Sequence, residues 1–162
     1  MKRAALVFLV VLALAASAAA QDKFSGTWQC GKAEKEFKIE VGDRPGHAFG
    51  IVQGKCAVTK AEIAGIQVKE EVWTSFGELS GNTVRARGAS FLNMANGDKV
   101  YSRGEGTMAF KDGAPQTEEG KWTFNSGTGK FKGLKGKGTY KCQFAADGTA
   151  TCELEGEYEL PK

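Results

Sequence analysis

The chain has 162 residues, of which 22 are glycine, and its formal net charge at pH 7 is +3. This length supports one domain with a modest core once a leader is removed. Lys2 and Arg3 lie in the predicted leader, so the remaining chain carries two fewer positive charges, that is +1. Such a balance gives no indication of binding to nucleic acid or to an anionic membrane.

Residues 1–20, MKRAALVFLVVLALAASAAA, have the pattern of a secretory signal peptide. A basic start is followed by an apolar run and by three small residues typical of a cleavage site. A retained membrane anchor is the alternative, but the apolar run is short for a membrane span. We therefore expect cleavage before Gln21 or two residues earlier, a secreted or periplasmic location, and one β-barrel domain over residues 21–162.

Alternating apolar and polar residues predict short strands through the rest of the chain, separated by turns rich in glycine. Before the final hairpin, the expected strands span residues 24–30, 34–41, 48–58, 66–76, 83–91, 99–110 and 116–124. Residues 58–65 are the best candidate for a single helical turn. Glycine inside strands weakens them unless the sheet must bend. The pattern therefore predicts an all-β protein with one antiparallel barrel of about eight strands.

The C-terminal stretch from Gly129 to Leu160 predicts a hairpin whose register can be derived. A three-residue loop that ends at Gly148 sets Cys142 opposite Cys152, at the near edge of the distance that a disulfide can bridge. The same register places Tyr140 and Tyr158 on one face. On the other face three lysines oppose three glutamates, and these pairs are Lys135–Glu159, Lys137–Glu157 and Lys141–Glu153.

An even number of cysteines in an exported chain predicts disulfides. All four lie after the leader, and the hairpin register pairs Cys142 with Cys152, which leaves Cys30 with Cys56. A metal site is the rival interpretation. It requires closely spaced ligands, but the chain has no Cys-x-x-Cys pair and its only histidine is His47. We expect neither a metal nor a cofactor.

The stretch GKWTFNSGTGKFKGLKGKGTYKC, residues 120–142, resembles small secreted bacterial proteins of unassigned function. Its Gly-Thr-Gly-Lys-Phe core at 127–131 is also similar to a barrel segment of allene oxide cyclases and dirigent proteins, although Ser126 stands where those families have glycine. The resemblance implies an eight-stranded antiparallel barrel with a hydrophobic interior. Gly26-Thr27-Trp28 resembles the Gly-x-Trp that opens calycin barrels such as lipocalins. Neither resemblance brings an activity, because none of the functional residues of those families can be placed on this chain.

Aromatic side chains and inward glycines are the main candidates for a ligand site. The glycines either let the barrel bend under the aromatic rings or leave space for a small apolar molecule. On the second interpretation the pocket residues are Trp28, Trp122, Phe124, Tyr140 and Tyr158.

The loop before residue 47 provides a second candidate site. The turn contains Asp43 and Arg44, and His47 follows it. Asp43 could orient the histidine, but no nucleophile motif accompanies these residues. No catalytic residue is therefore assigned, and enzymatic function stays uncertain. We expect an exported protein that binds a small hydrophobic ligand or an envelope partner. The alternatives are an isomerase or cyclase of the allene oxide cyclase type, and a periplasmic inhibitor that enters a hydrolase through the 42–47 loop.

Overall fold

The computed structural model describes residues 21–161 and consists almost entirely of strands. The predicted leader lies outside these residues. The elements are β1 (Asp22–Cys30), β2 (Lys35–Glu40), β3 (His47–Lys60), β4 (Glu62–Ile63), β5 (Ile66–Ser80), β6 (Thr83–Met94), β7 (Lys99–Lys111), β8 (Ala114–Gly127), η1 (Gly129–Phe131), β9 (Lys135–Phe144) and β10 (Ala150–Glu159).

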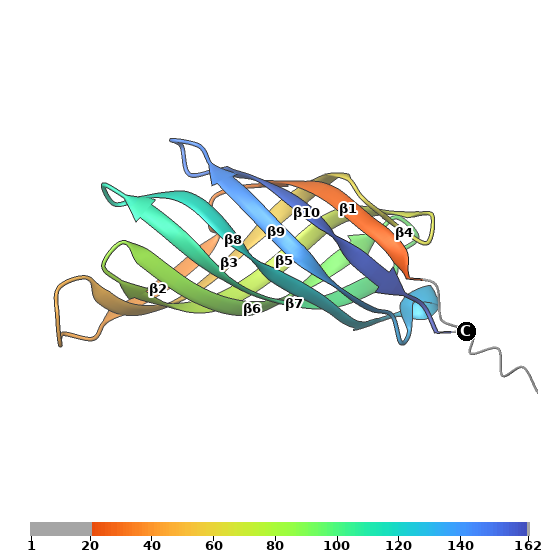
Figure 1. Ribbon diagram of the computed structural model, residues 1–162, viewed down its shortest axis with the longest axis horizontal. Coiled ribbons are helices and arrows are strands. Elements are labelled where there is room, and N and C mark those ends of the chain that lie inside the picture. Colours follow the sequence, from red (N-terminus) through yellow and green to blue (C-terminus); the bar gives the residue numbers. More distant parts are fainter. Residues whose placement is uncertain (1–20, 162) are drawn as a thin grey trace, which may run out of the picture.

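Eight of these strands close into an antiparallel barrel, which confirms the predicted fold class (Figure 1). The ring runs β3-β1-β10-β9-β8-β7-β6-β5, and pairing of β5 with β3 closes it. Because β3 and β5 pair along most of their length, neither strand leaves a long free edge in the ring. β2 is not part of the ring. It follows β1 along the same edge of β3, where it pairs with the first half of that strand.

The predicted helical turn over residues 58–65 is wrong. β3 continues to Lys60, and β4 then forms a short hairpin with the start of β5. Extended backbone prevails here because Ile63 can then turn into the core, where it is completely buried. In the part of the chain that the structure describes, no helix has the length and apolar character needed to cross a membrane.

The final hairpin has the predicted register. Cys142 lies opposite Cys152 and Leu154 opposite Tyr140, and the two glycines 138 and 156 face each other. Gly148 takes a φ of +84°, the left-handed conformation that its loop requires. Each of the three predicted lysine–glutamate pairs is opposed in this register.

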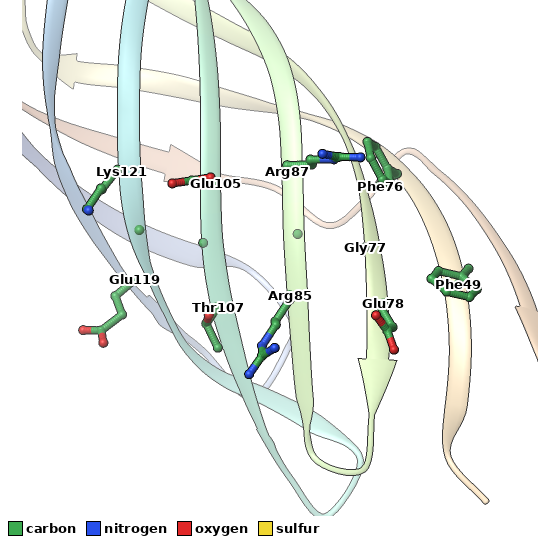
Figure 2. Close-up of a pocket in the computed structure, with 13 residues that line it drawn as sticks. Phe49, Phe76, Gly77, Glu78, Arg85, Arg87, Glu105, Thr107, Glu119 and Lys121 are labelled. Carbon is green, nitrogen blue, oxygen red and sulfur yellow. The ribbon is translucent and has the colours of Figure 1, made fainter. Parts of the chain in front are cut away.

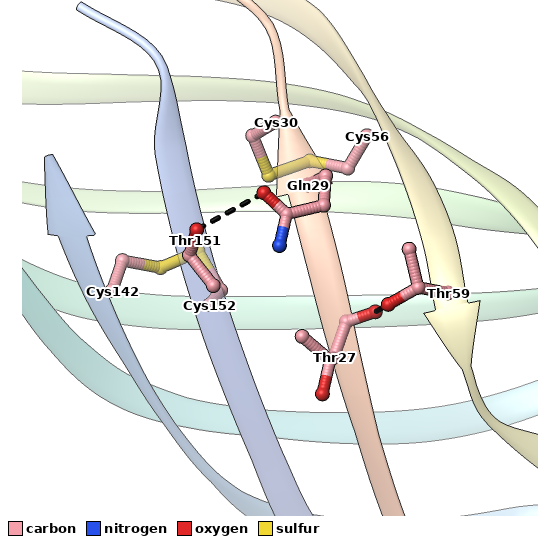
Figure 3. Close-up of a disulfide and its surroundings, with 8 residues drawn as sticks. All are labelled: Thr27, Gln29, Cys30, Cys56, Thr59, Cys142, Thr151 and Cys152. Atoms are coloured by element: carbon pink, nitrogen blue, oxygen red, sulfur yellow. Dashed lines mark hydrogen bonds between the residues drawn. A yellow bond between two sulfur atoms is a disulfide. The ribbon is translucent and has the colours of Figure 1, made fainter. Parts of the chain in front are cut away.

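Two disulfides join neighbouring strands of the barrel wall (Figure 3). Cys30–Cys56 links β1 to β3, and Cys142–Cys152 links β9 to β10, as the sequence predicts. Between them, on the outer surface, the Thr151 hydroxyl donates a hydrogen bond to the Gln29 side chain at 3.0 Å. Both cross-links therefore lie in the same wall, formed by β9, β10, β1 and β3.

The end of the barrel that holds β4 and η1 is closed, and both described chain ends lie there (Figure 1). Phe131 of η1 and Leu134 are completely buried, as are Ile63, Val68 and Val100. Asp98 fixes η1 in place, because its carboxylate accepts hydrogen bonds from the Lys130 backbone N–H and the Thr128 hydroxyl, both at 3.2 Å. Through these contacts η1 packs into this end of the barrel and closes it.

Aromatic rings packed on bare backbone fill the middle of the barrel. The ring of Trp122 lies over Gly138 and Gly156, where a β-carbon at Gly156 would come within 2.6 Å of it. Phe24 contacts Trp122 and Phe124 edge-on, with ring centroids 5.2 Å apart in both cases. Glycine is therefore needed at these two positions because a ring occupies the space of a side chain.

At the opposite end, long hairpins extend beyond the rest of the barrel and form an overhang (Figure 1). Inward-facing residues of β5, β6 and β7 at this end, such as Ser75, Leu79, Ala86 and Met108, are half-buried rather than buried. Solvent therefore contacts these inward-facing side chains, and we call this end the open end.

Candidate functional site

Large apolar side chains lie exposed on the outer surface of the overhang formed by β2, β3 and β5. Phe37 and Ile39 are 68% and 73% exposed. They lie opposite Ile51 and Phe49 of β3, and Ile51 also lies opposite Phe76 of β5. We call this surface the apolar outer face, and its residues are Phe37, Ile39, Val41, Phe49, Ile51 and Phe76.

The alternation along β3 determines which side of the sheet these residues take. Cys56 and Val58 are buried and face the lumen. Since successive side chains point to opposite faces, Phe49 and Ile51 face outward. A contiguous exposed apolar patch is characteristic of a surface that binds another macromolecule.

β2 adds an open backbone edge to this surface. Among the described strands it is hydrogen-bonded only to β3, so the N–H and C=O groups along its other side have no strand partner. Its remaining face carries charges, and Lys38 and Glu40 form an ion pair at 2.7 Å. A strand with a free edge can accept an added strand from another chain.

A depression of about 570 Å³, which we call the outer groove, lies beside the apolar outer face on the outer surface of β5 to β8 (Figure 2). It shares Phe49 and Phe76 with that face, and the Arg87 guanidinium lies 4.6 Å from the centre of the Phe76 ring. The other side chains that line it are Glu78, Arg85, Glu105, Thr107, Glu119 and Lys121. Acids and bases oppose one another across its strands, as in Glu78–Arg85 and Glu105–Lys121.

The predicted loop residues Asp43, Arg44 and His47 come together at one end of the apolar outer face. His47 Nδ1 lies 2.5 Å from an Asp43 oxygen, and Nε2 lies 3.0 Å from Glu78. Arg44 bonds the other Asp43 oxygen at 2.6 Å and the Ser80 hydroxyl at 3.2 Å. The hydrogen bond to His47, aided by the nearby charge of Arg44, lowers the pKa of Asp43.

His47 does not lie in the turn itself but is the first residue of β3, and its side chain is buried. It packs beside Phe49, with ring centroids 5.6 Å apart. Carboxylates occupy both ring nitrogens, so neither is free to accept a proton from a nucleophile. The cluster therefore fixes the β2–β3 turn rather than forming a catalytic base.

Four of the five predicted pocket aromatics lie in the packed core, where Trp122 and Phe124 have ring centroids 4.5 Å apart. The others are Trp28, which also packs against Phe24, and Tyr158. The Tyr158 hydroxyl accepts a hydrogen bond from the Ala64 backbone N–H at 2.9 Å and thereby holds the turn at the closed end. Tyr140 differs, because it is half-buried and faces the open part of the lumen.

No protein-family model matches this chain, and no curated protein matches it in sequence. The functional interpretation therefore rests on the geometry of its own surfaces.

A second polar cluster lies inside the lumen, and the sequence analysis did not single out its two glutamates. Glu118 of β8 faces inward, where the Tyr140 hydroxyl donates a hydrogen bond to it at 2.7 Å. Glu71 of β5 faces inward from the opposite wall, in register with the buried Cys56 and Leu92. We call Glu71, Glu118, Tyr140, Trp28 and Ser90 the lumen cluster.

Burial dominates the electrostatics of this cluster. It raises the pKa of Glu71, although hydrogen bonding from Ser90 and Trp28 opposes the rise. Burial likewise raises the pKa of Glu118 against the stabilising Tyr140 hydroxyl. The pKa of Tyr140 is raised by burial and then by the charges of both glutamates. In residues 21–161 no group of three His, Cys, Asp or Glu side chains is arranged to hold a metal ion.

The sequence does contain a signal for Glu118. Trp122 and Gly120 face the lumen, so strict alternation along β8 puts Glu118 on the same side. Glu71 has no comparable signal, because a bulge between Val68 and Glu70 shifts the alternation just before it.

Proposed function

We propose that this protein is an exported binding protein, and that it recognises an extended segment of an envelope protein on the apolar outer face. The observation that carries the proposal is the exposure of six large apolar side chains together on the outside of one hairpin overhang. Isolated exposed apolar residues are ordinary, but a cluster around a free strand edge is not.

The distribution of apolar residues favours a surface site over a hydrophobic pocket. In the middle of the barrel, aromatic rings take up the space above the glycines. On the overhang, comparable side chains face water with no described part of the chain over them. Covering them with a partner would remove apolar area from water, which is the main favourable contribution to association.

The free edge of β2 favours a partner segment that binds as an added strand. Backbone hydrogen bonds to β2 would supply affinity that does not depend on sequence. Specificity would come from alternate side chains. Those on the outer face would lie beside Phe37 and Ile39, and those on the other face would lie beside the charges of Lys38 and Glu40.

The outer groove extends the proposed site beyond the added strand. Its opposed acids and bases suit a partner that carries both signs of charge next to its apolar residues. A catalytic role has less support, because carboxylates occupy both ring nitrogens of His47. The cyclase and inhibitor alternatives stay predictions.

Site-specific photo-cross-linking in the cell of origin tests the proposal. A photoreactive phenylalanine analogue replaces Ile39, and in a matched control it replaces Tyr101, an exposed aromatic residue on β7 outside the apolar outer face. We expect a discrete heavier adduct from position 39 and none from position 101. The adduct should disappear when Phe37→Thr is combined with the probe at 39, since threonine keeps the strand preference but removes the apolar contact.

Three outcomes would contradict the proposal. Position 39 could give no adduct, or it could give the same adducts as position 101. An adduct of twice the mass of the chain would show that a second copy, and not an envelope protein, covers this face.

A further inference from the structure

Charges on neighbouring strands of the barrel wall are matched in sign. Wherever two charged residues lie directly opposite each other on paired strands within residues 21–161, one is acidic and the other is basic. Opposed unlike charges stabilise a pair of strands, whereas opposed like charges destabilise it. Examples from successive strands are Glu78–Arg85, Arg87–Glu105 and Glu119–Lys141.

β2 carries charges that no described strand matches. Glu36, Lys38 and Glu40 alternate in sign along one face of this strand. Their ion pair, Lys38–Glu40, runs along β2 itself, and its two side chains remain 47% and 60% exposed. The residues opposite them on β3 are uncharged, namely Val52, Gly50 and Ala48.

The same three residues also present the free backbone groups of β2. The Val41 N–H donates a hydrogen bond to the His47 carbonyl at 2.9 Å. Since hydrogen-bonded and non-hydrogen-bonded pairs alternate in an antiparallel ladder, the other odd-numbered residues of β2 also bond to β3. The N–H and C=O groups of Glu36, Lys38 and Glu40 therefore point toward the free edge.

The free edge has defined limits on both sides. β10 pairs with β1 only as far as Ala150, which lies opposite Cys30. The β9–β10 loop then turns back, and a β-carbon at Gly148 would lie 3.8 Å from the Lys32 side chain. A strand added to β2 would lie in line with β10, between this loop and the β2–β3 turn. Because β2 has six residues, the added strand pairs over a short segment.

We propose that the partner segment carries five consecutive residues in the order basic, apolar, acidic, apolar, basic. Its acid lies opposite Lys38, and its two bases lie opposite Glu36 and Glu40. Its apolar residues lie beside Phe37 and Ile39 on the apolar outer face. This order reads the same in both directions, so it does not depend on the direction of the added strand. The inference rests on the proposed function and names the class of segment that it recognises.

A second copy of this chain matches the free edge less well. Full antiparallel pairing of two β2 strands would set Lys38 opposite Lys38 and Glu36 opposite Glu40, and both contacts join like charges. A shift of two residues pairs Lys38 with Glu40, but it leaves Glu36 opposite Gly42, outside the strand. Charge complementarity therefore favours a different chain as the partner.

NMR titration of the ¹⁵N-labelled protein with two end-blocked peptides tests the inference. One peptide, Thr-Lys-Val-Glu-Val-Lys-Thr, has the proposed order, and the other, Thr-Glu-Val-Lys-Val-Glu-Thr, has its charges exchanged. We expect the first to shift the backbone amide signals of Glu36, Lys38 and Glu40 and to bind about tenfold or more tightly than the second. The chain has a positive net charge, so its overall field would favour the second peptide instead. Equal affinities, or tighter binding of the second peptide, would overturn the inference.

A charge-reversed strand provides a matched variant. Glu36→Lys, Lys38→Glu and Glu40→Lys together invert the charge order of β2 at exposed positions and should reverse the preference between the peptides. The control Glu155→Lys changes the net charge by the same amount at an exposed position on β10 and should keep the original preference. An unreversed preference in the triple variant, or a reversed one in the control, would contradict the assignment. The peptide comparison on the unmodified protein does not depend on the folding of either variant.

The two proposals can fail separately. Cross-linking at position 39 detects a partner whatever the sequence of its segment. An adduct at 39 without a preference between the peptides would overturn the charge order and leave the proposed function standing. A clear preference without an adduct would do the reverse. If neither peptide shifts the three β2 amide signals, the charge order is overturned whatever the cross-linking shows.

Discussion

The closed end and the open end of this barrel use apolar residues in opposite ways. At the closed end Phe131 of η1, Leu134 and Ile63 point inward and are completely buried. At the open end Phe37, Ile39 and Phe49 point outward and are exposed. The comparison indicates that the closed half of the barrel supplies most of the stability. The open half leaves apolar side chains exposed to water, where they add little to the stability of the fold.

The largest effect should come from the aromatic core. Trp122→Ala removes the ring that lies over Gly138 and Gly156 and should lower the free energy of unfolding by about 3–5 kcal/mol in urea denaturation. The control Tyr101→Ala, at an exposed position on β7, should change it by no more than about 0.5 kcal/mol. Similar losses in both variants would remove the proposed difference between a stabilising core and exposed surfaces.

Removing the disulfides should have the next largest effects. The cross-linked residues are separated by 26 positions in Cys30–Cys56 and by 10 in Cys142–Cys152. Chain entropy then predicts losses of about 3.5 and about 2.7 kcal/mol for the two paired Cys→Ala variants. Urea denaturation of both variants shows which one loses more free energy of unfolding. A larger loss for the Cys142–Cys152 pair would contradict this explanation.

A smaller effect, dependent on pH, should distinguish the lumen from the outer surface. Burial raises the pKa of Glu118 in the folded protein, so ionising it opposes folding. Its unfavourable contribution is absent below the unfolded pKa and develops as pH rises through the folded pKa. The stability of the unmodified protein should therefore fall relative to Glu118→Gln on raising the pH from 4 to 8. Thermal unfolding at several pH values measures this, with Glu119→Gln, which faces outward, as the control.

The smallest effect on stability should come from the apolar outer face itself. The double variant Phe37→Thr and Ile39→Thr should change the free energy of unfolding by no more than about 0.5 kcal/mol, because both side chains are already exposed. Urea denaturation measures this change. A loss comparable to that of Trp122→Ala would show that these residues belong to the core, and the proposed binding surface would have to be abandoned.

Local pairing rules were enough to predict the C-terminal hairpin. The Gly148 loop, the opposed cysteines and the lysine–glutamate pairs all require one register, and the structure has it. The barrel itself followed from short strands with internal glycines. These features depend on neighbours in sequence or on one turn, and single-sequence reasoning captures such relations well.

Features that depend on which side of a sheet is covered could not be predicted in the same way. The alternation of Phe37 and Ile39 is the same whether they face a lumen or water. The pattern therefore predicted that the two side chains share a face of the strand, but not whether that face is buried. The burial of His47 depends on Glu78, 31 positions away. Glu71 was missed because a bulge changes the alternation before it.

The continuity of β1 and β2 along β3 has a mechanical consequence. A force applied to β2 would run along β2 and residues 31–34 toward the barrel, and it would reach Cys30–Cys56 where β1 ends. That covalent link would take the load before the hydrogen bonds between β1 and β10 do. If the proposed partner pulls on the overhang, we therefore expect the domain to stay zipped while this disulfide is intact.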